Sequence, residues 1–134
     1  MCDSASLSSV SRYPNFNTRL LYLLPRPGIG WLAHKLLRAQ GIQIFRGVAF
    51  GDGCVLVRSG VGTVIDAKTI VGNEVRIFHQ VTIGRAHPTE ARAGSEERVI
   101  IGDEVVIGAG AKVLCKPGET LMIAEGTVIG ANAY

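Results

Sequence analysis

Aliphatic residues recur at every sixth position through the second half of the chain. They are Ile65, Val71, Ile77, Ile83, Ile101, Ile107 and Val113. Four residues after each of five of them stands a small or β-branched residue: Thr69, Val75, Val81, Val105 and Ala111. Residues six apart on an α-helix point about 240° apart, so this spacing excludes a simple helix. Glycine follows many of the aliphatic residues, which indicates a turn in each repeat rather than one long strand.

A parallel β-helix accounts for the period of six. Each six forms one short strand and a corner, and successive coils stack like rungs. The aliphatic residue that opens each six then points inward and lies about 4.8 Å from its equivalent in the next coil. The pattern therefore predicts an all-β solenoid over residues 41–134.

The N-terminal 40 residues lack this pattern. Residues 1–16 are rich in Ser and Asn and are expected to be disordered or loosely held. Residues 17–40 are expected to be helical, with a first helix from Asn17 or Thr18 to Leu24 and a second from Ile29 to Gln40. The predicted inner face of the second helix contains Ile29, Leu32, Ala33, Leu36 and Leu37.

Three irregularities interrupt the hexads. Between Leu56 and Ile65 the register slips by three residues, which predicts an enlarged corner at 58–62. From Arg85 to Arg98 no aliphatic residue stands where the period requires one, so this polar segment is expected to protrude as a loop. Ile83 and Ile101 are 18 residues apart, which is three hexads, so the chain is expected to re-enter in phase. The third irregularity covers residues 115–120.

Composition narrows the function classes. A net charge of +3 is compatible with a phosphate-bearing ligand but too small for a nucleic-acid-binding domain. The three cysteines are odd in number and lack metal-ligand spacing, so they are expected to be free thiols in a reducing cytoplasm, with Cys54 in the core. The apolar stretch at 20–37 is broken by two prolines and carries Lys35, so no membrane span is expected.

The hexads resemble those of the hexapeptide-repeat acyltransferases, the left-handed β-helix family, and in particular the serine O-acetyltransferase-like branch. The resemblance runs from about Gly41 to the C-terminus and is closest at Ser59–Ile65, Val75–Gly84 and Ile107–Val113. It implies left-handed coils, an exception to the usual right-handed crossover. It also implies a homotrimer, with active sites between prisms, that transfers acetyl from acetyl-CoA to a hydroxyl of a small serine-like or sugar-like acceptor.

The chain departs from this family at the catalytic positions. Aligned on the family's motifs, the base histidine falls on Ser59 and the second histidine on Arg98. Serine cannot act as a base at neutral pH, whereas histidine can. The candidate catalytic residues are therefore His79, expected to point outward between Ile77 and Val81, and His87 in the loop. A subunit contact for His79 and a solvated loop position for His87 are the alternatives.

The resemblance also implies binding residues. A slot for the pantetheine arm of coenzyme A is expected along small residues and one cation: Gly108, Ala109, Ala111, Lys112, Gly130 and Ala131. Ser59, Arg85 and Arg98 are expected to contact the acceptor. No metal is expected, because a zinc-dependent β-helix would need three suitably placed histidines and only His79 and His87 lie in the β-helical part.

A catalytically silent β-helix that scaffolds or binds a partner is the alternative function. Ser59 and Arg98 at the family's histidine positions favour it, and turnover of acetyl-CoA would separate the two hypotheses. The sequence leaves open the acceptor, the acyl chain length and whether the natural protein ends at Tyr134.

Overall fold

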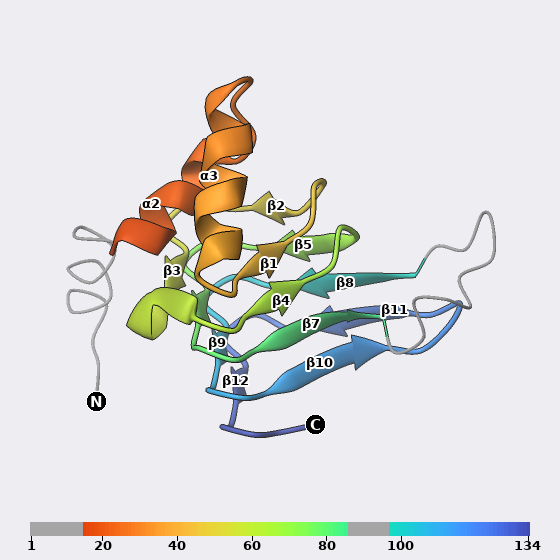
Figure 1. Ribbon diagram of the computed structural model, residues 1–134. Helices are drawn as coiled ribbons and strands as arrows, with labels where there is room; N and C mark the ends of the chain where they lie inside the picture. The colour runs from red at the N-terminus through yellow and green to blue at the C-terminus, as the bar shows by residue number, and fades with distance from the viewer. Residues whose placement is uncertain (1–14, 86–96) are drawn as a thin grey trace.

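The chain winds into four coils whose strands form three parallel sheets (Figure 1). The computed structural model describes residues 15–85 and 97–134. The first sheet, sheet A, contains β1 (Gln43–Ile44), β4 (Val64–Ile65), β7 (Thr82–Arg85) and β10 (Lys112–Cys115). Sheet B contains β2 (Ala49–Phe50), β5 (Thr69–Val71), β8 (Arg98–Ile101) and β11 (Thr120–Ile123). Sheet C contains β3 (Val55–Leu56), β6 (Arg76–Ile77), β9 (Val106–Ile107) and β12 (Val128–Ile129).

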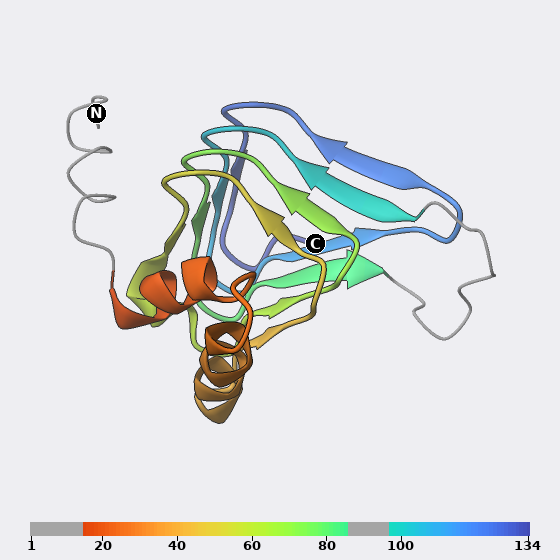
Figure 2. The same cartoon turned by 90° about the horizontal axis from the view of Figure 1, so that it is seen from above.

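The residues that open the hexads stack in register inside the coils, as predicted. Ile65 pairs with Ile83 in sheet A, Val71 with Ile101 in sheet B, and Ile77 with Ile107 in sheet C. All of these side chains are buried in one core. Burying stacked aliphatic side chains is the main stabilising term for a fold with so few large rings. Figure 2, seen from above, shows the successive coils lying over one another.

The number of residues between paired positions of successive coils shows where the hexads are interrupted. Ile44 pairs with Ile65, 21 positions on, so the first coil contains three extra residues, whereas Ile65 pairs with Ile83, 18 positions on. The extra residues belong to η1, a 3-10 turn at Val57–Gly60, which confirms the enlarged corner. Ile83 pairs with Val113, 30 positions on, so the chain leaves and re-enters in phase around an insertion of two hexads. Most of the predicted loop at 85–98 lies outside the described residues.

Two helices stand at the end of the prism that is opposite to the C-terminus (Figure 1). Helix α2 (Phe16–Leu23) begins earlier than predicted, because the Asn15 side chain caps it and accepts a hydrogen bond from the Thr18 N–H at 2.9 Å. Helix α3 (Ile29–Ala39) ends one residue before the predicted Gln40.

The predicted inner face of α3 is partly wrong. Its buried residues are Gly30, Ala33 and Leu37, whereas Ile29, Leu32 and Leu36 are exposed. Gly30 explains the difference, because a side chain there would collide with the Leu24 carbonyl. The glycine lets α3 approach the end of α2 closely, so the face of α3 that contains Gly30 is the one that packs.

Candidate active site

One edge of the prism, between sheets C and A, stacks corners from all four coils. The Gln80 N–H donates to the Val61 carbonyl at 2.9 Å, the Gly110 N–H to the His79 carbonyl at 3.0 Å, and the Asn132 N–H to the Ala109 carbonyl at 2.8 Å. We call residues 59–62, 79–80, 108–111 and 130–133 the His79 edge. This edge brings His79 close to most of the small residues expected to line the coenzyme A slot.

His79 is half-buried on this edge. The neighbouring Ile77 and Val81 point into the core, as predicted. The Nδ1 atom of His79 is buried and has no hydrogen-bond partner among the described residues. A buried polar atom without a partner destabilises a fold by about 1–3 kcal/mol, so such atoms usually meet a ligand, a water or another subunit.

The corner that contains Ser59 is held in an unusual conformation by α2. Arg58 and Ser59 have φ of 54° and 64°, in the left-handed region that most side chains avoid. The Asn17 Nδ2 group donates to the Ser59 carbonyl at 2.7 Å, and the Leu56 N–H donates to Thr18 Oγ1 at 2.9 Å. Asn17 and Thr18, the two alternative helix caps predicted from the sequence, are instead buried within α2 and fix this corner.

The expected coenzyme A slot is open at most of its positions. Gly108 and Ala109 are half-buried, and Gly130, Ala131 and Lys112 are exposed. Ala111 differs from the expectation, because its side chain is 0% exposed and lies in the core. Ala111 follows the corner at the position equivalent to Val81, which also points inward, so it gives no surface to a ligand.

A second edge, between sheets A and B, contains the two arginines expected to bind the acceptor. Arg85 ends β7, and its Nε donates to Asp66 Oδ2 at 2.8 Å. This hydrogen bond raises the pKa of the Arg85 guanidinium. We call residues 45–48, 66–68, 85, 97–98 and 115–119 the Arg85 edge.

Arg98 and Glu97 lie on the Arg85 edge with different exposure. Arg98 is exposed at the start of β8, whereas Glu97 is only 2% exposed and accepts a hydrogen bond from the Gly118 N–H at 2.9 Å. Both line a cavity of about 250 Å³ together with Thr69, whose buried hydroxyl has no partner among the described residues.

The two edges are separated within one chain. Strand β7 runs from the His79 edge to the Arg85 edge (Figure 1), and its four residues span about 10 Å at 3.3 Å per residue. His79 and Arg85 therefore cannot act on the same atom of a substrate in one copy. His87 lies outside the described residues. Asp66 and Glu97 were not among the predicted site residues, because Asp66 occupies an ordinary hexad position and Glu97 an ordinary loop position.

The remaining features to consider are the cysteines, a metal site and a membrane span. Cys54 and Cys115 are buried and unbonded to each other, and burial raises the pKa of both thiols. Residues 15–85 and 97–134 contain no group of three or more His, Cys, Asp or Glu side chains that could hold a metal ion. No helix within these ranges is long and apolar enough to cross a membrane.

Comparisons with known proteins point to one kind of enzyme. No protein-family model matches the chain. The chain is 38% identical over 120 residues to a serine acetyltransferase of Mycobacterium tuberculosis, covering 86% of this chain and 48% of that protein. It is 36% identical over 100 residues to a serine acetyltransferase of Helicobacter pylori, covering 69% of this chain and 49% of that protein.

Solved structures agree with the sequence relatives. A serine acetyltransferase from Vibrio cholerae superposes with a TM-score of 0.69 at 25% identity, covering 92% of this chain and 48% of that chain. A soybean serine acetyltransferase complexed with serine superposes with a TM-score of 0.66 at 28% identity, covering 97% and 54%. The chain thus spans about half the length of the relatives that it matches. The chain therefore belongs to the serine acetyltransferase branch of the hexapeptide-repeat acyltransferases, a left-handed β-helix family, as its repeats, its three-sheet prism and these similarities show.

Proposed function

We propose that the chain is an O-acetyltransferase that moves an acetyl group from acetyl-CoA to the hydroxyl of serine or a similarly small acceptor. The observation that carries the proposal is the His79 edge. A histidine with an unpartnered buried nitrogen there lies on the same stack of corners as the small residues Gly108, Ala109, Gly130 and Ala131. The similarity to serine acetyltransferases supports serine as the first acceptor to test.

In this proposal His79 acts as the general base. The acceptor oxygen attacks the thioester carbonyl carbon while His79 takes the hydroxyl proton. The C–S bond then breaks, the acetyl ester forms, and coenzyme A leaves as a thiol after receiving a proton from the imidazolium. The peptide N–H groups of Ala109 and Ala131, which donate to no backbone carbonyl among the described residues, stabilise the oxyanion and hold the pantetheine arm.

We further propose that the working enzyme is a homotrimer. In a cyclic trimer each copy presents one surface to one neighbour and a different surface to the other. The His79 edge of one copy can therefore meet the Arg85 edge of the next, which would unite groups that lie at different edges of a single chain. The unpartnered His79 Nδ1 and Arg76 Nη2 support an additional partner near sheet C.

The activity is tested by release of coenzyme A from acetyl-CoA in the presence of serine. His79→Ala is expected to lower turnover about 10²–10⁴-fold, the usual contribution of a general base. Glu74→Ala is the control, because Glu74 is exposed at a different corner, between sheets B and C, outside the His79 edge. Equal rates for wild type and His79→Ala would exclude His79 as the base.

The shared site is tested by mixing two inactive variants. His79→Ala and Arg98→Ala are expected to be slow separately, and co-refolded mixtures should regain part of the wild-type rate, because some interfaces then contain both native residues. An absence of recovery in trimers that demonstrably mix would place both residues in the same copy's site.

A catalytically silent scaffold is the second candidate, favoured by Ser59 and Arg98 at the family's histidine positions. It predicts no release of coenzyme A with any small hydroxyl acceptor. Thermal unfolding with acetyl-CoA distinguishes the cases further, because a ligand that binds only the folded state raises the melting temperature. An absence of both turnover and thermal stabilisation would support the scaffold.

A further inference from the structure

The segment 15–51, which contains both helices and the start of the first coil, is positively charged. Residues 15–51 contain no Asp or Glu, and they contain five cationic side chains: Arg19, Arg26, Lys35, Arg38 and Arg46. Within the described ranges none of these five forms an ion pair with an acidic side chain. Ten of the eleven acids of the chain stand at or after Asp52 in the sequence, and the other, Asp3, lies outside the described residues.

Large apolar side chains are exposed on the same elements. Helix α3 buries only its Gly30 side and rises beyond the first coil (Figure 1). Ile29, Leu32 and Leu36 form an exposed stripe at helical spacing, and Leu32 is 51% exposed. Trp31 is 56% exposed, and the Lys35 Nζ lies 4.3 Å from the centroid of its ring. Phe45, on the neighbouring turn, is also exposed. Clustered apolar exposure of this kind marks an interaction surface.

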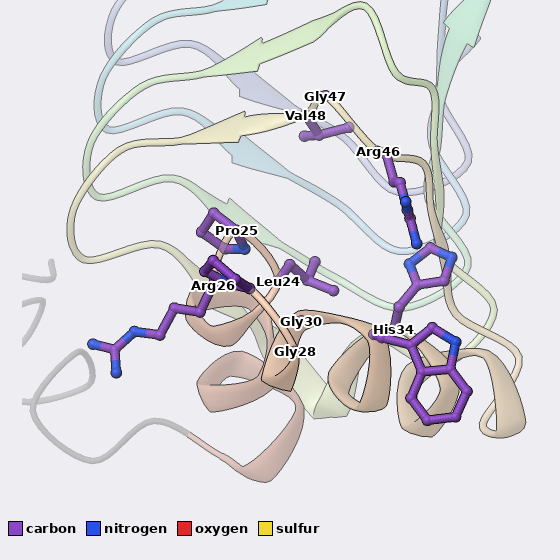
Figure 3. A pocket seen from close by; sticks show the side chains of 11 residues that line it. Leu24, Pro25, Arg26, Gly28, Gly30, His34, Arg46, Gly47 and Val48 are labelled. Atoms are coloured by element: carbon purple, nitrogen blue, oxygen red, sulfur yellow. The ribbon is translucent and has the colours of Figure 1, made fainter.

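A cavity lies between α3 and the turn at 46–48. It has a volume of about 420 Å³, and its lining includes Trp31, His34 and Arg46 but no acidic side chain. Figure 3 shows the Arg46 guanidinium and the His34 imidazole pointing toward one another. Two basic groups that face each other without an acid between them form a suitable place for an anion such as phosphate.

We propose that α3 and the turn at 45–46 dock on the surface of a membrane that contains anionic lipid. Helices that lie in the headgroup layer combine Lys and Arg with exposed Trp, Phe and Leu, which is the composition found here. The cations would contact lipid phosphates, the apolar stripe would enter the acyl boundary, and the cavity would receive one headgroup phosphate. A second copy that docks through this same face fits less well, because a two-fold contact would bring five cations against five cations. The inference does not depend on the catalytic proposal.

Trp31 is the only tryptophan of the chain, so its fluorescence reports on this surface alone. The full chain is mixed with vesicles of phosphatidylcholine, or of equal parts phosphatidylcholine and phosphatidylglycerol. With the anionic vesicles we expect co-sedimentation and a blue shift of Trp31 emission, both lost in about 0.5 M salt, where charges are screened within a few ångströms. Equal behaviour with the two vesicle types would overturn the proposal.

Two variants and two controls locate the contact. Leu32→Ser/Leu36→Ser and Lys35→Glu/Arg38→Glu are each expected to weaken vesicle binding at least about tenfold. Met122→Ser and Lys116→Glu change an exposed apolar and an exposed cationic residue at the other end of the prism, and should bind like wild type.

Two further measurements test the other occupants. If glycerol phosphate shifts Trp31 emission while no vesicle sediments the protein, the cavity binds soluble phosphate and the membrane proposal fails. If wild type ignores vesicles and Leu32→Ser/Leu36→Ser splits a larger assembly in light scattering, the surface is a contact between copies, and the proposal fails as well.

Discussion

At the scale of single residues, Glu97 shows how the Arg85 edge is held together. Its carboxylate is almost fully buried and accepts the Gly118 N–H, which fixes the turn between β10 and β11. Gly118 adopts φ of 76°, a conformation suited to glycine, so the turn depends on that residue type and on the carboxylate acceptor. The carboxylate therefore connects the start of β8 to the coil that follows it.

Glu97→Ala is expected to lower the free energy of unfolding by about 1–3 kcal/mol, because the hydrogen bond from the Gly118 N–H to the buried Glu97 carboxylate is lost. Glu119→Ala removes an exposed carboxylate from the same turn and should change the free energy by no more than about 0.5 kcal/mol. Urea unfolding followed by circular dichroism measures both. Similar effects of the two substitutions would contradict a structural role for Glu97.

Single residues were the level at which the sequence predicted least. The inward positions of Ile77, Val81 and Cys54 followed from the hexad period and are confirmed. The docking role of Asn17 could not be predicted, since a cap and a tertiary contact have the same local sequence. The catalytic role of His79 stays a prediction.

At the scale of elements, the corners rather than the strands specify the coil. Gly72 and Gly102 stack on one another, and a Cβ at Gly72 would lie 2.8 Å from the carbonyl carbon of Gly102. Beside them the Asp52 N–H donates to Asn73 Oδ1 at 2.8 Å and the Asn73 N–H to Asp103 Oδ1 at 2.7 Å. The recurring Gly-Asx pairs of the sequence therefore form a ladder that joins successive coils.

Gly102→Ala is expected to destabilise the fold by about 2 kcal/mol or more, because the new Cβ would meet the Glu125 nitrogen at 2.8 Å and the Ile123 oxygen at 2.9 Å. Gly130→Ala, at the equivalent kind of corner in the last coil, meets nothing within 4 Å and should be nearly neutral. Thermal unfolding compares the two. A neutral Gly102→Ala would show that the corners are more adaptable than this packing implies.

The sequence predicted the elements well where the period was regular. Strand positions, the enlarged corner and the in-phase return after the insertion all follow from counting in sixes. The inner face of α3 was misjudged because helical periodicity treats Leu32 and Leu36 as core residues. The decisive residue was Gly30, whose lack of a side chain sets the approach to α2 and leaves the leucines exposed.

At the scale of the whole molecule, the core contains two thiols that matter at high pH. Burial is the main cause that raises the pKa of Cys54 and Cys115 above the ordinary value of 9.0. Below pH 9.0 both thiols are neutral in the folded and in the unfolded chain, so their contribution to the free energy of unfolding is fully present. Above it the unfolded chain releases the protons first, so folding stability falls as pH rises toward the folded pKa values.

We therefore expect the free energy of unfolding to decrease above pH 9.0, by up to about 1.4 kcal/mol per pH unit for each thiol. Cys54→Ala/Cys115→Ala should reduce this slope while lowering stability at neutral pH. Urea unfolding across this pH range provides the measurement. An unchanged slope in the double variant would assign the pH dependence to other groups, such as Tyr22, whose pKa burial also raises.

The overall architecture was predictable, but the division of the site between two edges was not. Linear spacing places Ser59, His79, Arg85 and Arg98 along one solenoid without showing which corners they occupy. Only the pairing of strands shows that His79 lies at the corner before β7 and Arg85 at the far end of this strand. This separation is the reason that the proposed site requires a neighbouring copy.

The central claim is that acetyl-CoA binds along the His79 edge, and hydrogen–deuterium exchange tests it most directly. Amide exchange of the full chain is compared with and without acetyl-CoA. We predict slower exchange at residues 79–80, 108–111 and 130–133, with little change at the corners 51–53 and 102–104, which serve as an internal control. Protection confined to the control corners or to α3, or no protection at saturating acetyl-CoA, would contradict the account.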